Sequence, residues 1–335
     1  MAYDDNDQVL WLHGGSRSLT YLDDFWRYDK QTETWSEQNP GTKPTARFAH
    51  VMVYDKDRQA LWLHGGNLHE DLWKYDLQAK TWSEQSPSGL RPAARFSHVM
   101  AYDPDSQALW LHGGQDGSRN PYLGDVWKYD LQIGTWSEYG NAVVRGGHVM
   151  AYDSNQKALW LHGGFDTKAH GDLWRFDVEG GKNTTTATST TVTAIRLSQA
   201  WAGSWTELNP PTKPTARAGH VIVYDGDSQA LWLQGGGWAL DDLWRFDLQA
   251  ETWSDRTPDP KPTARDGMAM VYDSKRKALW LHGGYDVWHY GDLWKFDVKV
   301  GTWTEQQQPS ARPFDRAEHA MAFDSDSQAL WIHGG

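Results

Sequence analysis

Short apolar runs separated by polar turn residues fill the chain. Residues 46–87 show the pattern clearly, with runs at 50–55, 60–66, 71–76 and 81–85 that are rich in Val, Leu, Trp and Tyr. Runs of this length and composition, bounded by Asp, Gly, Pro or Lys, predict β-strands. The connections between them are short, so neighbouring strands are antiparallel. No segment shows helical periodicity, and each unit is therefore expected to be a four-stranded up-and-down sheet.

This unit repeats along the chain, and the phrase ALWLHGG or a close variant occurs seven times. The first glycines of the seven Gly-Gly pairs are Gly14, Gly65, Gly113, Gly163, Gly235, Gly283 and Gly334. They are 48 to 51 residues apart, except for one interval of 72 residues. The longer interval contains residues 178–204, a Thr-rich stretch that predicts a flexible, solvated insertion in the fourth unit. Residues 1–335 are thus expected to form one repeat domain.

The second strand of each unit carries apolar side chains on both of its faces. Alternation places Leu61 and Leu63 on one face, and Trp62 and His64 on the other. The chain has 22 Trp, of which 19 occupy repeated positions on the second, third and fourth strands. A sheet that is apolar on both faces must pack against a neighbour on each side. A radial arrangement of similar sheets meets that requirement.

The Gly-Gly pair, an aromatic residue on the third strand and a Trp after six further residues resemble the kelch repeat. The aromatic and Trp positions are Tyr28 and Trp35, Tyr75 and Trp82, Tyr129 and Trp136, Phe246 and Trp253, and Phe296 and Trp303. The resemblance covers nearly the whole chain and implies an all-β, kelch-type β-propeller with one blade per repeat. Seven blades are expected, the seventh lacking its two outer strands. A six-bladed ring with a redundant hairpin and a fragment of a longer array are the alternatives.

Composition narrows the possible partners. The net charge is −12 and there is no basic run, which argues against binding to nucleic acid. No apolar run approaches the roughly 18 residues that indicate a membrane span. The chain has no Cys, which excludes disulfides and thiolate metal sites. Its first residues lack the pattern of a secretory leader; the compartment is undetermined, with the cytoplasm favoured.

Loops after the Gly-Gly pairs and loops between units are expected on one face of the propeller. The former vary in length and carry large aromatic residues, which suggests a recognition surface. Packing of these residues over the blade edges is the alternative. The candidate ligand-binding aromatics are Trp238, Trp288, Tyr290, Tyr122 and Tyr21.

An Arg-x-x-His motif opens most units and is expected on the same face. The arginines are Arg47, Arg95, Arg145, Arg217, Arg265 and Arg316, with Met268 in place of the His after Arg265. Their repetition favours a structural role, in which each Arg bonds loop carbonyls or carboxylates. The alternative is a ring of guanidinium groups for an acidic peptide or a sugar acid. Kelch relatives that bind acidic peptides use arginines on this face, so the resemblance keeps that alternative open.

Catalytic and metal-binding chemistry are not indicated. The repeated histidines of the HGG phrase are equivalent positions around a ring and diverge, whereas metal ligands must converge on one point. No small asymmetric cluster stands out from the repeat as a catalytic site would. The sequence therefore predicts a non-catalytic scaffold without cofactors that binds a protein partner, with carbohydrate binding as the alternative. The incomplete last blade also makes self-association a possibility.

Overall fold

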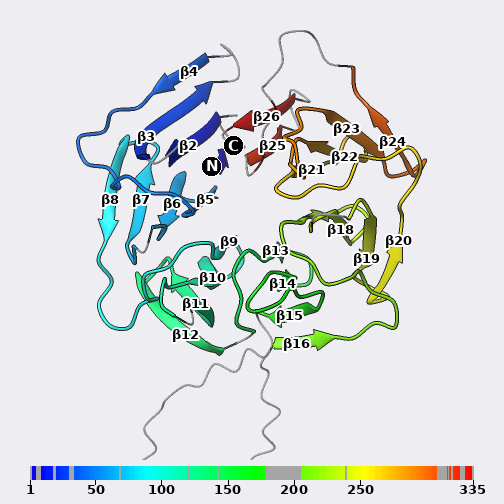
Figure 1. The fold of residues 1–335 in the computed structure, drawn as a ribbon. Helices are drawn as coiled ribbons and strands as arrows, with labels where there is room; N and C mark the ends of the chain where they lie inside the picture. Colours follow the sequence, from blue (N-terminus) through cyan, green and yellow to red (C-terminus); the bar gives the residue numbers. More distant parts are fainter. Residues whose placement is uncertain are drawn as a thin grey trace, which may run out of the picture.

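The sheets of the protein are arranged radially around a common axis (Figure 1). The computed structural model describes residues 2–4, 9–17, 20–29, 34–67, 69–119, 121–141, 143–178, 205–237, 240–307, 315, 317, 320–324 and 329–333. Every regular element in these ranges is a β-strand. Within the same ranges, no helix is long and apolar enough to cross a membrane.

The strands group into seven blades in chain order. Blade 1 contains β1 (Ala2–Asp4), β2 (Val9–Arg17), β3 (Thr20–Asp29) and β4 (Thr34–Glu37). Blade 2 contains β5 (Val51–Asp55), β6 (Ala60–His64), β7 (Leu72–Asp76) and β8 (Thr81–Gln85). Blade 3 contains β9 (Val99–Asp103), β10 (Ala108–Gln115), β11 (Tyr122–Asp130) and β12 (Thr135–Asn141). Blade 4 contains β13 (Val149–Asp153), β14 (Ala158–His162), β15 (Leu173–Asp177) and β16 (Trp205–Leu208). Blade 5 contains β17 (Val221–Asp225), β18 (Ala230–Gln234), β19 (Leu243–Asp247) and β20 (Thr252–Asp255). Blade 6 contains β21 (Ala269–Asp273), β22 (Ala278–His282), β23 (Leu293–Asp297) and β24 (Thr302–Glu305). Blade 7 contains β25 (Ala320–Asp324) and β26 (Ala329–His333).

Six blades are four-stranded antiparallel sheets in sequential order, and the described strands of blade 7 form a two-stranded sheet. Innermost strands of neighbouring blades contact each other, from β1 and β5 through to β21 and β25. The predicted all-β propeller with four-stranded antiparallel blades is confirmed. The insertion predicted at 178–204 lies, apart from Val178, outside the described residues, so the domain division stays a prediction.

Two hairpins are longer than expected. Residues predicted as loops after the Gly-Gly pairs of blades 1 and 3 continue the strands as β2–β3 and β10–β11. Both hairpins shift register at the glycines, between His13 and Gly15 and between His112 and Gly114. A bulge at the glycine pair lets the two strands continue pairing beyond it. The segments after the Gly-Gly pairs of blades 1 and 3 are therefore extended β-hairpins.

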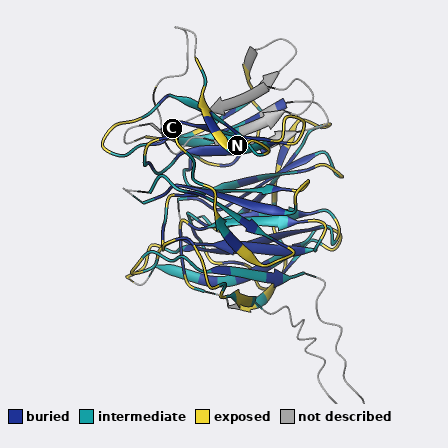
Figure 2. Ribbon diagram, turned by 90° about the vertical axis from the view of Figure 1, so that its right-hand side faces the viewer, coloured by how far each residue is buried: buried dark blue, intermediate teal, exposed yellow. Residues whose placement is uncertain are grey.

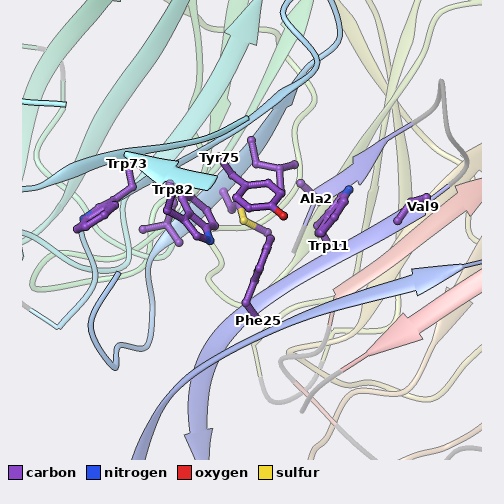
Figure 3. Packing of buried hydrophobic residues seen from close by; sticks show 10 residues of the cluster. Ala2, Val9, Trp11, Phe25, Trp73, Tyr75 and Trp82 are labelled. Atoms are coloured by element: carbon purple, nitrogen blue, oxygen red, sulfur yellow. The ribbon is translucent and has the colours of Figure 1, made fainter. Parts of the chain in front are cut away.

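The hydrophobic cores lie between neighbouring blades, because each sheet has apolar side chains on both of its faces. Trp11 and Phe25 of blade 1 lie in one cluster with Tyr75 and Trp82 of blade 2 (Figure 3). Leu61 and Leu63 belong to the same cluster, whereas Trp62 joins the next cluster with blade 3. The interfaces between blades 3 and 4, blades 4 and 5, and blades 5 and 6 repeat this arrangement. Blades 2 to 5 therefore each contribute a leucine face to one interface and a tryptophan face to the next. Seen from the side, the buried residues run through the strands, and the exposed ones lie in the loops and on outermost strands such as β8 and β24 (Figure 2).

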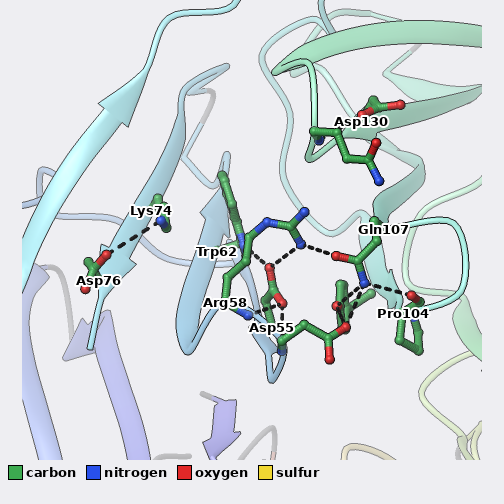
Figure 4. A network of polar contacts seen from close by, with 11 residues as sticks. Asp55, Arg58, Trp62, Lys74, Asp76, Pro104, Gln107 and Asp130 are labelled. Carbon is green, nitrogen blue, oxygen red and sulfur yellow. Dashed lines mark hydrogen bonds and ion pairs between the residues drawn. The ribbon is translucent and has the colours of Figure 1, made fainter. Parts of the chain in front are cut away.

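The turns between first and second strands define the lower face. Asp55 accepts hydrogen bonds from the backbone N–H groups of Asp57 and Arg58, both at 3.1 Å, and from Trp62 Nε1 at 3.2 Å. Arg58 reaches across to blade 3, where its Nη1 donates to Gln107 Oε1 at 2.6 Å (Figure 4). Asp55 therefore caps its turn by accepting backbone hydrogen bonds.

Candidate binding face

The upper face is formed by the loops after the Gly-Gly pairs and by the connectors between blades. Backbone hydrogen bonds hold the two kinds of segment together. In blade 2, the N–H of Asn67 donates to the carbonyl of Phe48 at 3.1 Å, and the N–H of Gly66 donates to the carbonyl of Arg95 in blade 3 at 2.9 Å. Both kinds of loop thus lie on one face, as predicted from the alternation of strand direction.

The connector arginines are buried and paired with carboxylates of their own blades. Arg95 donates from Nη1 to Gly113 O at 3.0 Å, and from Nη1 and Nη2 to the two oxygens of Asp125 at 2.7 and 2.6 Å. Asp125 also accepts Trp127 Nε1 at 2.6 Å. Burial opposes ionisation of Asp125, but the guanidinium group outweighs it and keeps the pKa of this carboxyl below its usual value. Equivalent pairs are Arg47 with Asp71, Arg145 with Asp172, Arg217 with Asp242, and Arg265 with Asp292.

Five of the six repeated arginines thus bond loop carboxylates, as a structural role requires. Five guanidinium groups are 0 to 2% exposed, so they do not form an open ring at the mouth of the channel. A buried, bidentate Arg–carboxylate pair is strongly oriented and is costly to open. Arg316 lies outside the described residues. The five described arginines therefore lie beneath the accessible surface of this face.

Histidines pair across the blade interfaces beneath this face. His64 Nδ1 lies 3.1 Å from His98 Nε2 of the next blade. The same contact joins His112 to His148 at 2.9 Å and His162 to His220 at 3.0 Å. The glycine pair makes room for these rings: a Cβ on Gly113, whose φ is +63°, would lie 2.9 Å from His148 Cε1. Burial lowers the pKa of His112 to about 3, and the positive charge of Arg145 adds to the effect.

One interface replaces both histidines together. Gln234 occupies the HGG histidine position of blade 5, and Met268 occupies the paired position of blade 6. Met268 Cε lies 3.2 Å from where a Cβ on Gly235 would be, which places Met268 where the other interfaces hold a histidine ring. In the sequence these were two separate irregularities. The structure makes them the two halves of one interface.

Five aromatic side chains lie along the upper face of blades 1 to 4. We call Tyr21, Phe48, Phe96, Tyr122 and Phe165 the aromatic crescent. Tyr21 stacks on Phe48 with ring centres 4.8 Å apart, and Phe48 is 6.4 Å from Phe96. Tyr122 lies 6.1 Å from Phe165. Tyr21 is 44% and Phe165 41% exposed, so large apolar groups remain accessible here.

The predicted ligand-binding set contained Tyr21 and Tyr122 of the crescent but not Phe48, Phe96 or Phe165. Phe48 and Phe96 follow the connector arginine, and the same position is Gly146 in blade 4, Ala218 in blade 5 and Asp266 in blade 6. Variation at one position inside a repeated motif was the available signal. A Cβ on Gly146 would lie 3.6 Å from Tyr122 Cδ1, so the ring of Tyr122 lies next to this glycine.

The remaining predicted aromatics belong to blades 5 and 6. Trp238 lies outside the described residues. Trp288 is 75% exposed at the tip of the loop after β22. Tyr290 is half-buried, and the guanidinium carbon of Arg265 lies 3.9 Å from the centre of its ring. Trp288 is therefore at the surface, whereas Tyr290 of the same loop packs against Arg265. Across the described ranges, no group of three or more His, Cys, Asp or Glu side chains could hold a metal ion.

Comparison with known proteins agrees with this architecture. A sequence profile described as the KLHDC2/KLHL20/DRC7 Kelch-repeats domain matches residues 2–204 and 178–335. Mei4-dependent protein 6 of Schizosaccharomyces pombe is similar over 65 residues at 34% identity, which covers 19% of this chain and 9% of that protein. The profile matches span nearly the whole chain, and the six four-stranded sheets are kelch-type blades. The chain belongs to the kelch-repeat family.

Proposed function

We propose that this protein is a non-catalytic scaffold that binds a protein partner through the aromatic crescent. Kelch propellers are typically protein-interaction scaffolds and are generally not enzymes. The observation that carries the proposal is the crescent itself, in which variable positions on a repeated framework place two groups of contacting aromatic rings on one face, with Tyr21 and Phe165 exposed. Aromatic side chains are enriched at the centres of protein interfaces, where they bury large areas at low entropic cost.

The residues after the connector arginines make the two halves of the face chemically different. Phe48 and Phe96 place aromatic rings over blades 2 and 3, whereas Ala218 and Asp266 are small or acidic over blades 5 and 6. The partner segment that suits this face carries apolar side chains toward blades 1 to 4. An acidic segment is less suitable, because the described arginines already hold carboxylates of the protein itself.

Carbohydrate binding is the second candidate, and the exposed ring of Trp288 is the observation that favours it. Sugar rings stack on exposed aromatic faces. Screening an oligosaccharide array with wild type and with Trp288→Lys tests this alternative directly. Binding that the substitution abolishes would favour carbohydrate over protein.

A displayed library of random peptides tests the proposal and does not require the natural partner to be identified. Peptides selected on the full chain are titrated against wild type and against the double variant Phe48→Ala/Phe96→Ala. We expect the affinity of most selected peptides to fall at least about 30-fold, as for an interface hot spot. The matched control is Ile133→Ala, at an apolar side chain that is 71% exposed in the turn between β11 and β12. Unchanged affinity in the double variant refutes the proposal, once its thermal unfolding shows that it is folded.

A further inference from the structure

Two upper-face loops share one backbone arrangement. In blade 4, Phe165 forms a β-bridge with Ala169, and in blade 6 Tyr285 forms the same bridge with His289. The loops also close on the Gly-Gly pair in the same way: the N–H of His170 donates to Gly164 O at 2.9 Å, and the N–H of Tyr290 donates to Gly284 O at 2.8 Å. The two loops are therefore structural equivalents with independent side chains.

An aspartate caps each turn from inside. Asp166 Oδ1 accepts the backbone N–H groups of Thr167 and Lys168, the latter at 3.0 Å. Asp286 Oδ1 accepts the N–H groups of Val287 and Trp288, the latter at 2.9 Å. Such aspartate-capped turns hold the backbone without help from the residues at the tip.

The tips of the two turns differ in chemistry. Blade 4 presents Thr167 and Lys168, which are polar. Blade 6 presents Val287 and Trp288, which are 82% and 75% exposed. Because the polar tip forms the same turn, the apolar pair is not required to build it. Two adjacent, exposed apolar side chains therefore need another explanation.

Side-chain contacts of Tyr290 also stabilise the turn in blade 6. Tyr290 donates its hydroxyl to Asp286 Oδ2 at 2.9 Å, and its ring lies against the guanidinium group of Arg265, 3.9 Å from centre to carbon. Tyr285 and His289 stack with their ring centres 5.7 Å apart. Because several contacts fix the turn, the backbone of Val287 and Trp288 is held in one conformation before any ligand arrives. Less conformational entropy is then lost on binding.

We propose that Val287 and Trp288 form a preorganised anchor that packs against an apolar segment of the protein partner. The anchor rests on the proposed function in that its ligand is a protein, but it is separate from the aromatic crescent. A protein segment suits the pair better than a sugar does. A stacked sugar makes no use of a neighbouring Val, and both oxygens of Asp286 are already hydrogen-bonded within the turn. Tyr290 then supports the anchor from below.

The chain supplies its own matched variant. Val287→Thr/Trp288→Lys gives blade 6 the tip of blade 4, whose turn has the same backbone hydrogen bonds. Amide chemical shifts of residues 284–291 check that the turn is retained. The selected peptides are titrated against this variant, against Phe48→Ala/Phe96→Ala and against Lys168→Ala as the control. We expect the tip exchange to weaken binding at least about 30-fold and the control to leave it unchanged.

The outcomes separate the anchor from the crescent. Loss of affinity in both double variants supports both contacts. Loss only in the crescent variant overturns the anchor, and loss only in the tip exchange supports the anchor but overturns the crescent as the main surface. If neither variant loses affinity, both are overturned. A dimer in sedimentation that the tip exchange converts to monomer would assign the anchor to a second copy and overturn the partner named here, as would oligosaccharide binding that the exchange abolishes.

Discussion

The histidine pairs at the blade interfaces predict how stability depends on pH. The interface between blades 3 and 4 holds His112 and His148, with their nitrogens 2.9 Å apart. The interface between blades 5 and 6 holds Gln234 and Met268 instead. The double variant His112→Gln/His148→Met therefore places a pair that the protein already uses into a second interface. Each single variant, in contrast, removes one ring and leaves its partner unpaired.

The expected magnitudes follow from burial and hydrogen bonding. A buried polar group that loses its partner costs about 1–3 kcal/mol, so each single variant is expected to lower the free energy of unfolding by that amount at neutral pH. The double variant is expected to lose less than the sum of the two, because it removes both polar partners together. A strictly additive double variant would show that the two rings do not depend on each other.

The pH dependence gives the sharper test. The ordinary histidine pKa is 6.5, and burial lowers the pKa of His112 in the folded protein to about 3. Stability from this group is therefore complete above pH 6.5 and is lost as the pH falls toward 3, since only the unfolded chain takes up the proton. Between pH 7 and pH 5 the loss is about 2 kcal/mol for His112. Burial also holds the pKa of His148 well below its ordinary value, so this residue adds to the loss.

Urea unfolding at a series of pH values, followed by tryptophan fluorescence, measures this directly. The double variant should lose at least about 2 kcal/mol less than wild type when the pH falls from 7 to 5. The same variant with an unchanged pH slope would refute the assignment of acid sensitivity to the buried pair. Wild type itself should unfold in acid with several protons taken up, because equivalent pairs occur at other interfaces.

Other contacts give further predictions. Arg95→Met leaves its carboxylate partner buried without a cation and is expected to cost about 3–5 kcal/mol in urea unfolding. Gly163→Ala should lower Tm more than Gly134→Ala; both glycines have positive φ, but only at Gly163 would the new Cβ clash with the histidine of the next blade. Equal losses in the two variants would contradict the packing argument. Tyr102→Phe removes the hydroxyl that lies 2.6 Å from Asp57, and NMR titration should show the pKa of Asp57 rising toward 3.8. An unchanged pKa would assign the shift to another group.

Much of the fold could be predicted because its determinants are local. Alternation within a strand decides which side chains share a face, so the placement of Leu61 and Trp62 on opposite sides of a blade followed from the sequence. The pairing of aromatic and Trp positions on adjacent strands was equally regular, as in Tyr75 opposite Trp82. These features depend on neighbours within one blade.

Features that cross blades were harder to foresee. His50 and His64 belong to the same repeat, yet His64 pairs with His98 of the next blade, because the angle between blades decides which rings meet. The sequence also did not reveal which aspartates pair with the connector arginines, for a related reason. Arg47 and Asp71 are 24 residues apart and Arg95 and Asp125 are 30 apart, since the loops between them differ in length. A contact without fixed spacing gives no periodic signal.

Gln234 and Met268 indicate which stretch of sequence must be duplicated as one piece when a blade is added. Their interface is encoded by the second strand of one blade and by the connector of the next, so a gene segment that ends at a blade boundary would separate them. A duplication of one whole repeat period that begins at an HGG phrase, instead of at the first strand of a blade, keeps matched partners together. A blade added in that way brings both interface residues together. A blade duplicated from its own first strand brings one residue from each of two different pairs.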